Sequence, residues 1–164
     1  MMMQAQSKAD LLHDVSQFLF REARYADDHR YEEWESLWAD DGVYWIPANG
    51  HDIDPDRQMS IIYDNRSRIS LRVRQLMTGK RHTQEPQSRL RRIVGNIELL
   101  KTDGRELNVT CNTIIFESAL RGDIIWASRN EFVLRRHDDD FRIARKKVAL
   151  VNNDKAIFTL SFLV

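Results

Sequence analysis

The stretch RELNVTCNTIIFESAL (105–120) decides the fold, because its side chains alternate in character from one residue to the next. The odd positions from 107 to 115 carry Leu, Val, Cys, Thr and Ile, and the even positions between them carry Asn, Thr, Asn and Ile. A period of two is that of a β-strand, and the polar residues on one face indicate that this face is the wetter one.

Strand-like segments lie on both sides of this stretch, at 92–101, 124–136 and 141–151, and all three are rich in β-branched and aromatic residues. Asp103-Gly104 and Arg121-Gly122 are hairpin signals, and the acidic run 138–140 is a plausible turn. The segments therefore predict an antiparallel meander. A last apolar strand is expected at Ile157–Val164.

The first half of the chain shows helical spacing instead. Ser7 to Asp10 resembles a capping box, and an apolar stripe follows it at Leu11, Leu12, Val15, Phe18 and Leu19. A second helix is expected after Asp28, with aromatic residues at Tyr31, Trp34 and Trp38 and an end at Gly42.

Between the helices we expect a short strand at 43–46, closed by Pro47, and a polar loop over 48–59. Residues 60–77 return to helical spacing, and Gly79 is expected to end that helix. Helices followed by a meander define an α+β fold. We predict one domain over 1–164, helical over about 7–78 and a sheet over about 89–164. The sheet is expected to be strongly curved, mixed or antiparallel and cone-shaped, wrapped around the N-terminal helices.

Composition excludes several classes of protein. The chain has 25 basic and 25 acidic residues, which argues against a dedicated nucleic-acid binder. Its single cysteine excludes a disulfide framework, a thiolate-held iron–sulfur cluster and a cysteine-based zinc finger. No apolar run has the length of a membrane span and no signal peptide is recognised, so the expected compartment is the cytoplasm.

The zero net charge hides a segregation, because residues 27–64 carry a net −9 and residues 66–105 a net +8. Such blocks can be ordinary solvated faces, or they can steer assembly. Together with an apolar strand at the sheet edge, they predict that the chain associates with itself.

The sequence offers few candidates for chemistry. Asp52, Asp54 and Asp56 have calcium-loop spacing, but Arg57 stands where the turn needs glycine and Tyr63 where a bidentate glutamate should close the site. The five histidines are scattered, without a local pair for an iron site. We therefore assign no catalytic, cofactor-binding or metal-binding residue, and expect Cys111 to be buried and inert.

Three longer stretches carry a resemblance to a known family: FLFREARYADDHRYEEWESLWADDGVYWIPA (18–48), IYDNRSRISLRVRQLMTG (62–79) and HTQEPQSRLRRIVGNI (82–97). With the ending FTLSFLV (158–164), they resemble the β (small) subunits of bacterial aromatic-ring-hydroxylating, Rieske-type dioxygenases.

The resemblance implies a nuclear-transport-factor-2-like (cystatin-like) fold. It also implies an α (large) subunit as partner, which carries the Rieske 2Fe-2S cluster and the mononuclear iron. Since such enzymes often contain three of each subunit, the resemblance implies that the expected self-association gives a trimer. The chain itself is then an accessory subunit without a cofactor of its own, in an enzyme that adds O2 to an aromatic ring to give a cis-dihydrodiol. A Rieske centre takes two cysteines and two histidines, and this chain has too few cysteines.

Two other readings stay open at this point. A stand-alone dehydratase or isomerase on the same cone fold would use acid–base groups in the cone, for which Tyr31, Tyr44 and His82 are the pocket candidates. A small-molecule binding module would use the same cavity without catalysis. The identity of an aromatic substrate is beyond the sequence.

Overall fold

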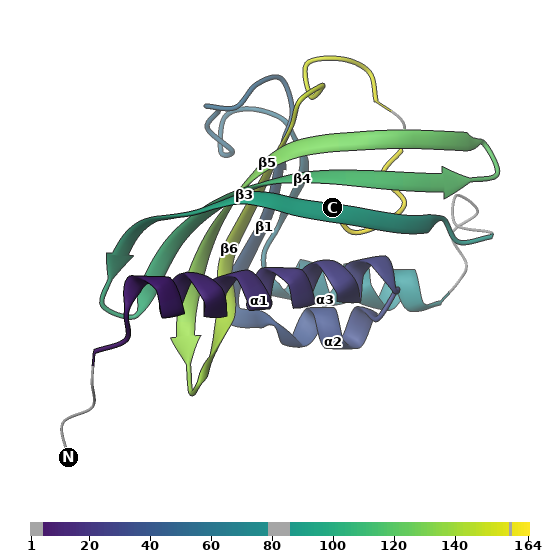
Figure 1. Cartoon of the computed structure of the whole chain (residues 1–164). Coiled ribbons are helices and arrows are strands. Elements are labelled where there is room, and N and C mark those ends of the chain that lie inside the picture. Colours follow the sequence, from purple (N-terminus) through teal and green to yellow (C-terminus); the bar gives the residue numbers. More distant parts are fainter. Residues whose placement is uncertain (1–4, 79–85, 158) are drawn as a thin grey trace.

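The computed structural model describes residues 5–78, 86–157 and 159–164. His82 and Gly79 lie outside the described residues, as does Phe158. The described part contains three helices and a six-stranded sheet. The predicted α+β class is confirmed, and the sheet curves over the helices, which all lie on one side of it (Figure 1).

Two of the three described helices begin at side-chain caps. Helix α1 (Lys8–Asp27) begins after Ser7, whose hydroxyl accepts a hydrogen bond from the Asp10 main-chain N–H. Helix α3 (Arg66–Met77) begins in the same way after Asn65. The short helix α2 (Tyr31–Ser36) has no side-chain cap and depends on packing, with Tyr31 and Trp34 buried.

The sheet order is β2-β1-β6-β5-β4-β3. Four long strands form the predicted meander through consecutive antiparallel pairs. They are β3 (Arg89–Asp103), β4 (Glu106–Ala119), β5 (Gly122–His137) and β6 (Asp140–Leu150). Strand β1 (Trp38–Pro47) pairs in parallel with β6, and β2 (Ser60–Asp64) pairs antiparallel with β1, which makes the sheet mixed.

Two predicted helix boundaries are wrong. Trp38 begins β1 instead of continuing the second helix, and Gly42 lies inside that strand instead of ending a helix. A Cβ atom on Gly42 would lie 2.7 Å from Cε3 of the Trp38 ring, so the glycine allows a close approach. Residues 60–64 form β2, because they pair with β1 through contacts that local spacing does not reveal.

The predicted last strand at Ile157–Val164 is also wrong. The described residues there form no strand, and Ser161, Phe162, Leu163 and Val164 are buried. In Figure 1 the chain leaves β6, loops outward and returns to the space between the sheet and the helices. In its described residues, the end of the chain therefore offers no exposed apolar edge strand through which copies could associate.

The two charged blocks meet within one chain. Glu35 pairs with Arg66 at 2.9 Å, Asp64 with Arg72 at 2.7 Å, and Asp27 with Arg92 at 2.6 Å. Each pair joins the acidic segment to the basic one and ties a helix to another helix or to the sheet. These three ion pairs between the acidic and basic segments form within one chain. The charge segregation is therefore not by itself evidence that copies of the chain associate.

Candidate functional site

A buried ion pair lies inside the curved sheet. Glu22 comes from the inner face of α1 and Lys146 from the inner face of β6, and Lys146 Nζ lies 2.6 Å from Glu22 Oε1. The two side chains are 5% and 1% exposed. Trp34 Nε1 donates a second hydrogen bond to the same carboxylate oxygen, at 3.0 Å.

A second buried pair lies nearby. Arg92 of β3 donates from Nε to Asp27 Oδ1 at 2.6 Å and from its main-chain N–H to Asp27 Oδ2 at 2.9 Å. Its Nη2 donates to the main-chain oxygen of Leu163 at 2.8 Å. Since an unpaired buried charge is costly, these partners are what make burial of the guanidinium tolerable.

Burial and pairing act in opposite directions on Glu22. Burial by itself would raise the pKa of its carboxyl, but the charges of Lys146 and Arg92 and the two hydrogen bonds outweigh burial and hold this pKa below the ordinary 4.5. Burial lowers the pKa of Lys146, and the Glu22 carboxylate opposes that effect. The arrangement favours a stable ion pair rather than a proton donor and acceptor.

The two pocket candidates among the described residues, Tyr31 and Tyr44, make different contacts. Tyr44 is fully buried, and its hydroxyl donates to the main-chain oxygen of Val164 at 2.8 Å and accepts from its N–H at 3.1 Å. Burial raises the pKa of Tyr44 well above its usual value. The Tyr31 hydroxyl lies 2.9 Å from Nδ1 of His29 instead. With His82 outside the described residues, the pocket role of all three stays a prediction.

Little space remains inside the cone. The cavity there has a volume of about 10 Å³ and is lined by residues of α1, β3, β4, β5 and β6, among them Glu22, Arg92, Cys111 and Lys146. That is room for about one water molecule and not for an organic substrate. Among the described residues, no group of three or more histidine, cysteine, aspartate or glutamate side chains is placed to hold a metal ion.

Cys111 lies in this packed interior on β4, and burial raises the pKa of its thiol to about 11. We expect a disulfide reagent at about pH 8 to modify less than about one tenth of the protein in the time that fully labels the chain in denaturant. Absorbance of the released thiol measures both rates. Equal rates in the two conditions would contradict the burial of this thiol.

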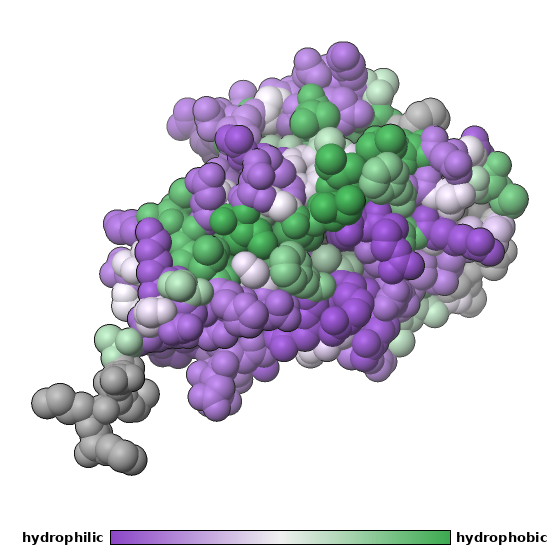
Figure 2. All heavy atoms as spheres, viewed as in Figure 1, coloured by the Kyte–Doolittle hydropathy of each residue, from purple (hydrophilic) through white to green (hydrophobic). Residues whose placement is uncertain are grey.

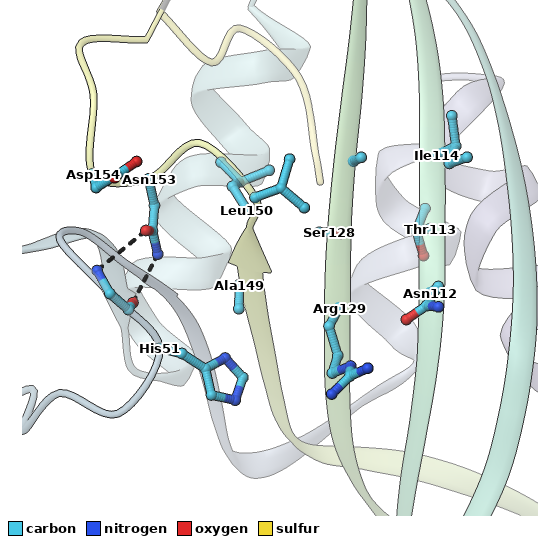
Figure 3. Close-up of a pocket in the computed structure, with 13 residues that line it drawn as sticks. His51, Asn112, Thr113, Ile114, Ser128, Arg129, Ala149, Leu150, Asn153 and Asp154 are labelled. Atoms are coloured by element: carbon cyan, nitrogen blue, oxygen red, sulfur yellow. Dashed lines mark hydrogen bonds between the residues drawn. The ribbon is translucent and has the colours of Figure 1, made fainter.

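A groove of about 700 Å³ lies elsewhere, bounded by β4, β5, the end of β6 and two loops (Figure 3). Asn153 joins the loops, because its side chain accepts from the Gly50 N–H at 3.1 Å and donates to the Gly50 oxygen at 2.7 Å. His51 and Arg129 project beside the groove in Figure 3. The groove is open and shallow, and it brings together no nucleophile with a base.

Next to the groove, the outer face of the sheet carries exposed apolar residues in adjacent rows. Ile93, Ile114 and Ala127 lie opposite one another on β3, β4 and β5. The main-chain N–H of Val151 donates a hydrogen bond to the main-chain oxygen of Ala127. In the next row Phe116 lies opposite Ile125. All of these except Ala127 are exposed large hydrophobic residues. Figure 2 shows hydrophobic residues gathered over the sheet and beside α1, with hydrophilic residues around them. Contiguous exposed apolar patches mark interaction sites.

The two buried ion pairs, Glu22–Lys146 and Asp27–Arg92, were not predicted from the sequence. A signal for Glu22 existed, because Glu22 continues the apolar stripe of α1 at the spacing of Phe18 and Leu19. Lys146 gave no such signal, since Arg145-Lys146-Lys147 is typical of an exposed strand.

A curved mixed sheet over three helices matches the nuclear-transport-factor-2-like fold. Residues 21–154 match the model of the ring hydroxylating beta subunit family. The chain therefore belongs to the β subunits of ring-hydroxylating dioxygenases, which are accessory subunits of an oxidoreductase.

Individual relatives support the same family assignment. The chain is 33% identical to the anthranilate 1,2-dioxygenase small subunit of Acinetobacter baylyi, over 90% of this chain and 93% of that one. It is 40% identical to the toluate 1,2-dioxygenase subunit beta of Pseudomonas putida, over 55% of this chain and only 59% of the relative. The crystal structure of the benzoate 1,2-dioxygenase beta subunit from Burkholderia mallei superposes with a TM-score of 0.74 at 25% identity, covering 92% of this chain and 95% of that chain.

Proposed function

We propose that this chain serves in the cytoplasm as the β subunit of an oxygenase that adds O2 to an aromatic ring to give a cis-dihydrodiol, and that it assembles with a large α subunit. The observation that carries this proposal is the filled cone, whose cavity of about 10 Å³ leaves no room for an aromatic substrate. The small cavity supports a reaction that takes place on the partner.

The residues of this chain do not fit the metal centres of such an enzyme. A Rieske cluster needs two cysteines and two histidines, whereas the only cysteine here is Cys111, buried in the interior. We place both the 2Fe-2S cluster and the mononuclear iron in the α subunit. No helix among the described residues is long and apolar enough to span a membrane.

The test is reconstitution. The isolated chain, supplied with reductase, ferredoxin and NADH, is expected to oxidise no aromatic substrate, and co-expression with its α subunit is expected to yield an active complex. Product analysis by mass spectrometry measures both. Turnover by the isolated chain at an enzymatic rate, of order 1–10³ per second, would favour the dehydratase or isomerase reading instead.

We also propose that the chain forms a homotrimer, with no nucleic acid as partner, and that it acts as one domain. One core cluster includes residues from α1, α3 and all the long strands, which supports a single unit. The outer-face rows replace the failed edge-strand argument for self-association, because they leave large apolar side chains in solvent.

Replacing Ile125 by aspartate is expected to shift the chain from a trimer to a monomer, because a charge in an apolar contact of more than about 1,000 Å² is left without a partner. Light scattering should then report 19.4 kDa instead of three times that mass. Leu71→Asp is the matched control, since Leu71 is also an exposed apolar residue but lies on α3. A monomeric parent chain would refute the trimer.

A further inference from the structure

The segment Thr159–Val164 fills the interior of the cone. The four residues from Ser161 onward are buried, and the Phe162 ring packs edge-on against Trp126 of β5, with ring centroids 5.8 Å apart. The segment reaches this place through residues 151–157, which form no strand and are largely exposed. It is held by the interior and not by continuity with a neighbouring strand.

The interior holds this segment by its main chain. The Tyr44 hydroxyl contacts both the N–H and the oxygen of Val164, and Lys146 Nζ donates to the same oxygen at 2.7 Å. Arg92 Nη2 donates to the Leu163 oxygen. All three side chains are buried. Buried side-chain donors that bond main-chain oxygens are one way in which proteins hold an extended peptide.

These donors are fixed by other partners. Glu22 holds Lys146, Asp27 holds Arg92, and the Tyr44 ring lies edge-on against Trp34 and Trp38. A site whose groups are held in place before the ligand arrives loses little entropy on binding. The cone thus has the two properties of a binding site: oriented polar groups at fixed positions, and apolar walls for the side chains between them.

We propose that the interior of the cone is a peptide-binding site whose resident ligand is the chain's own segment 159–164, and that it binds this segment without a covalent connection. Its ligand class is a short extended peptide with the order aromatic, aliphatic, aliphatic, as in Phe162, Leu163 and Val164. Binding of this segment is also what closes the cone to small molecules. The proposal does not depend on the α partner.

The test uses the full chain with a protease site inserted between Lys155 and Ala156, both of which are exposed. The chain folds with the segment attached and is then cut. We expect the 156–164 fragment to stay bound through gel filtration and to exchange slowly with a fluorescent synthetic peptide of the same sequence, as followed by anisotropy. A peptide with Leu163→Asp should bind at least about 100-fold more weakly, because it buries a carboxylate without a partner.

Two matched tyrosine variants of the cleavable chain report on the site itself. Tyr44→Phe removes the hydroxyl that contacts Val164 and should speed release of the cut fragment about tenfold. Tyr31→Phe removes a hydroxyl that contacts His29 and should leave the release rate unchanged. Immediate loss of the fragment on cutting, unfolding of the cut protein in excess peptide, or equal release from both tyrosine variants would each overturn the proposal.

Discussion

Replacing Lys146 by methionine is expected to lower the free energy of unfolding by about 3–5 kcal/mol. Lys146 is the buried cation opposite Glu22, and methionine fills a similar volume without the charge. The Glu22 carboxylate would then remain in the interior with Trp34 Nε1 as its one remaining hydrogen-bond donor among the described residues. Urea denaturation followed by circular dichroism measures the loss.

The matched control removes both charges together. In Glu22→Gln with Lys146→Met, the glutamine oxygen can still accept from Trp34 and no charge is left unpaired, so we expect the double variant to recover most of the loss. A double variant as unstable as Lys146→Met alone would show that the pairing is not the cause.

The loss of stability in acid tests the Glu22–Lys146 pair independently. The folded-state pKa of Glu22 lies below its ordinary value, so its stabilisation is complete above the ordinary pKa of 4.5 and is lost as the pH falls through the folded value. Between about pH 5 and pH 3, the parent should therefore lose more stability than the double variant.

Replacing Trp38 by alanine is expected to cost about 3–5 kcal/mol of stability. The Trp38 side chain is almost fully buried and packs edge-on against the rings of Trp34 and Tyr44, at centroid distances of 5.4 and 5.7 Å. Alanine would leave a cavity beside two rings that also hold the buried ion pair and the C-terminal segment in place. Thermal unfolding measures the effect.

Trp38→Phe is the informative companion. Nε1 of Trp38 is buried and has no hydrogen-bond partner among the described residues, so phenylalanine keeps an aromatic contact and removes an unsatisfied donor. We expect its cost to be clearly smaller than that of alanine. An alanine variant that melts like the parent but loses a bound ligand would assign these aromatic residues to a binding site instead.

The sequence was most informative where structure depends on near neighbours. The meander from β3 to β6 could be predicted because alternating residues and short turns are local, and Gly104 adopts the positive φ of 56° that such turns use. Helix α1 was equally clear from its cap and its stripe.

Structure that depends on distant partners could not be predicted. Tyr31, Trp34 and Trp38 fit a helical stripe, yet the chain turns into β1 at Trp38 because β6, about a hundred residues later, offers it a parallel partner. For the same reason, residues 60–64 form a strand and not the start of a helix.

The contents of the interior could not be predicted from the sequence for a different reason. An apolar ending such as SFLV is equally compatible with an edge strand and with a buried segment, and only the three-dimensional position of Lys146, Tyr44 and Arg92 decides between them. Buried charges are seldom expected from sequence, because their tolerance depends on partners that lie far along the chain.

The alternation of buried and exposed residues along β4 predicts how substitutions in this strand affect the protein. From 107 to 117 its odd-numbered residues are buried, while the even-numbered Ile114 and Phe116 are exposed. Substitutions at odd-numbered and at even-numbered positions of β4 should therefore have different effects. Damaging changes at odd positions should leave little protein in the cell, whereas damaging changes at 114 and 116 should leave normal amounts of a chain that fails to find its partners.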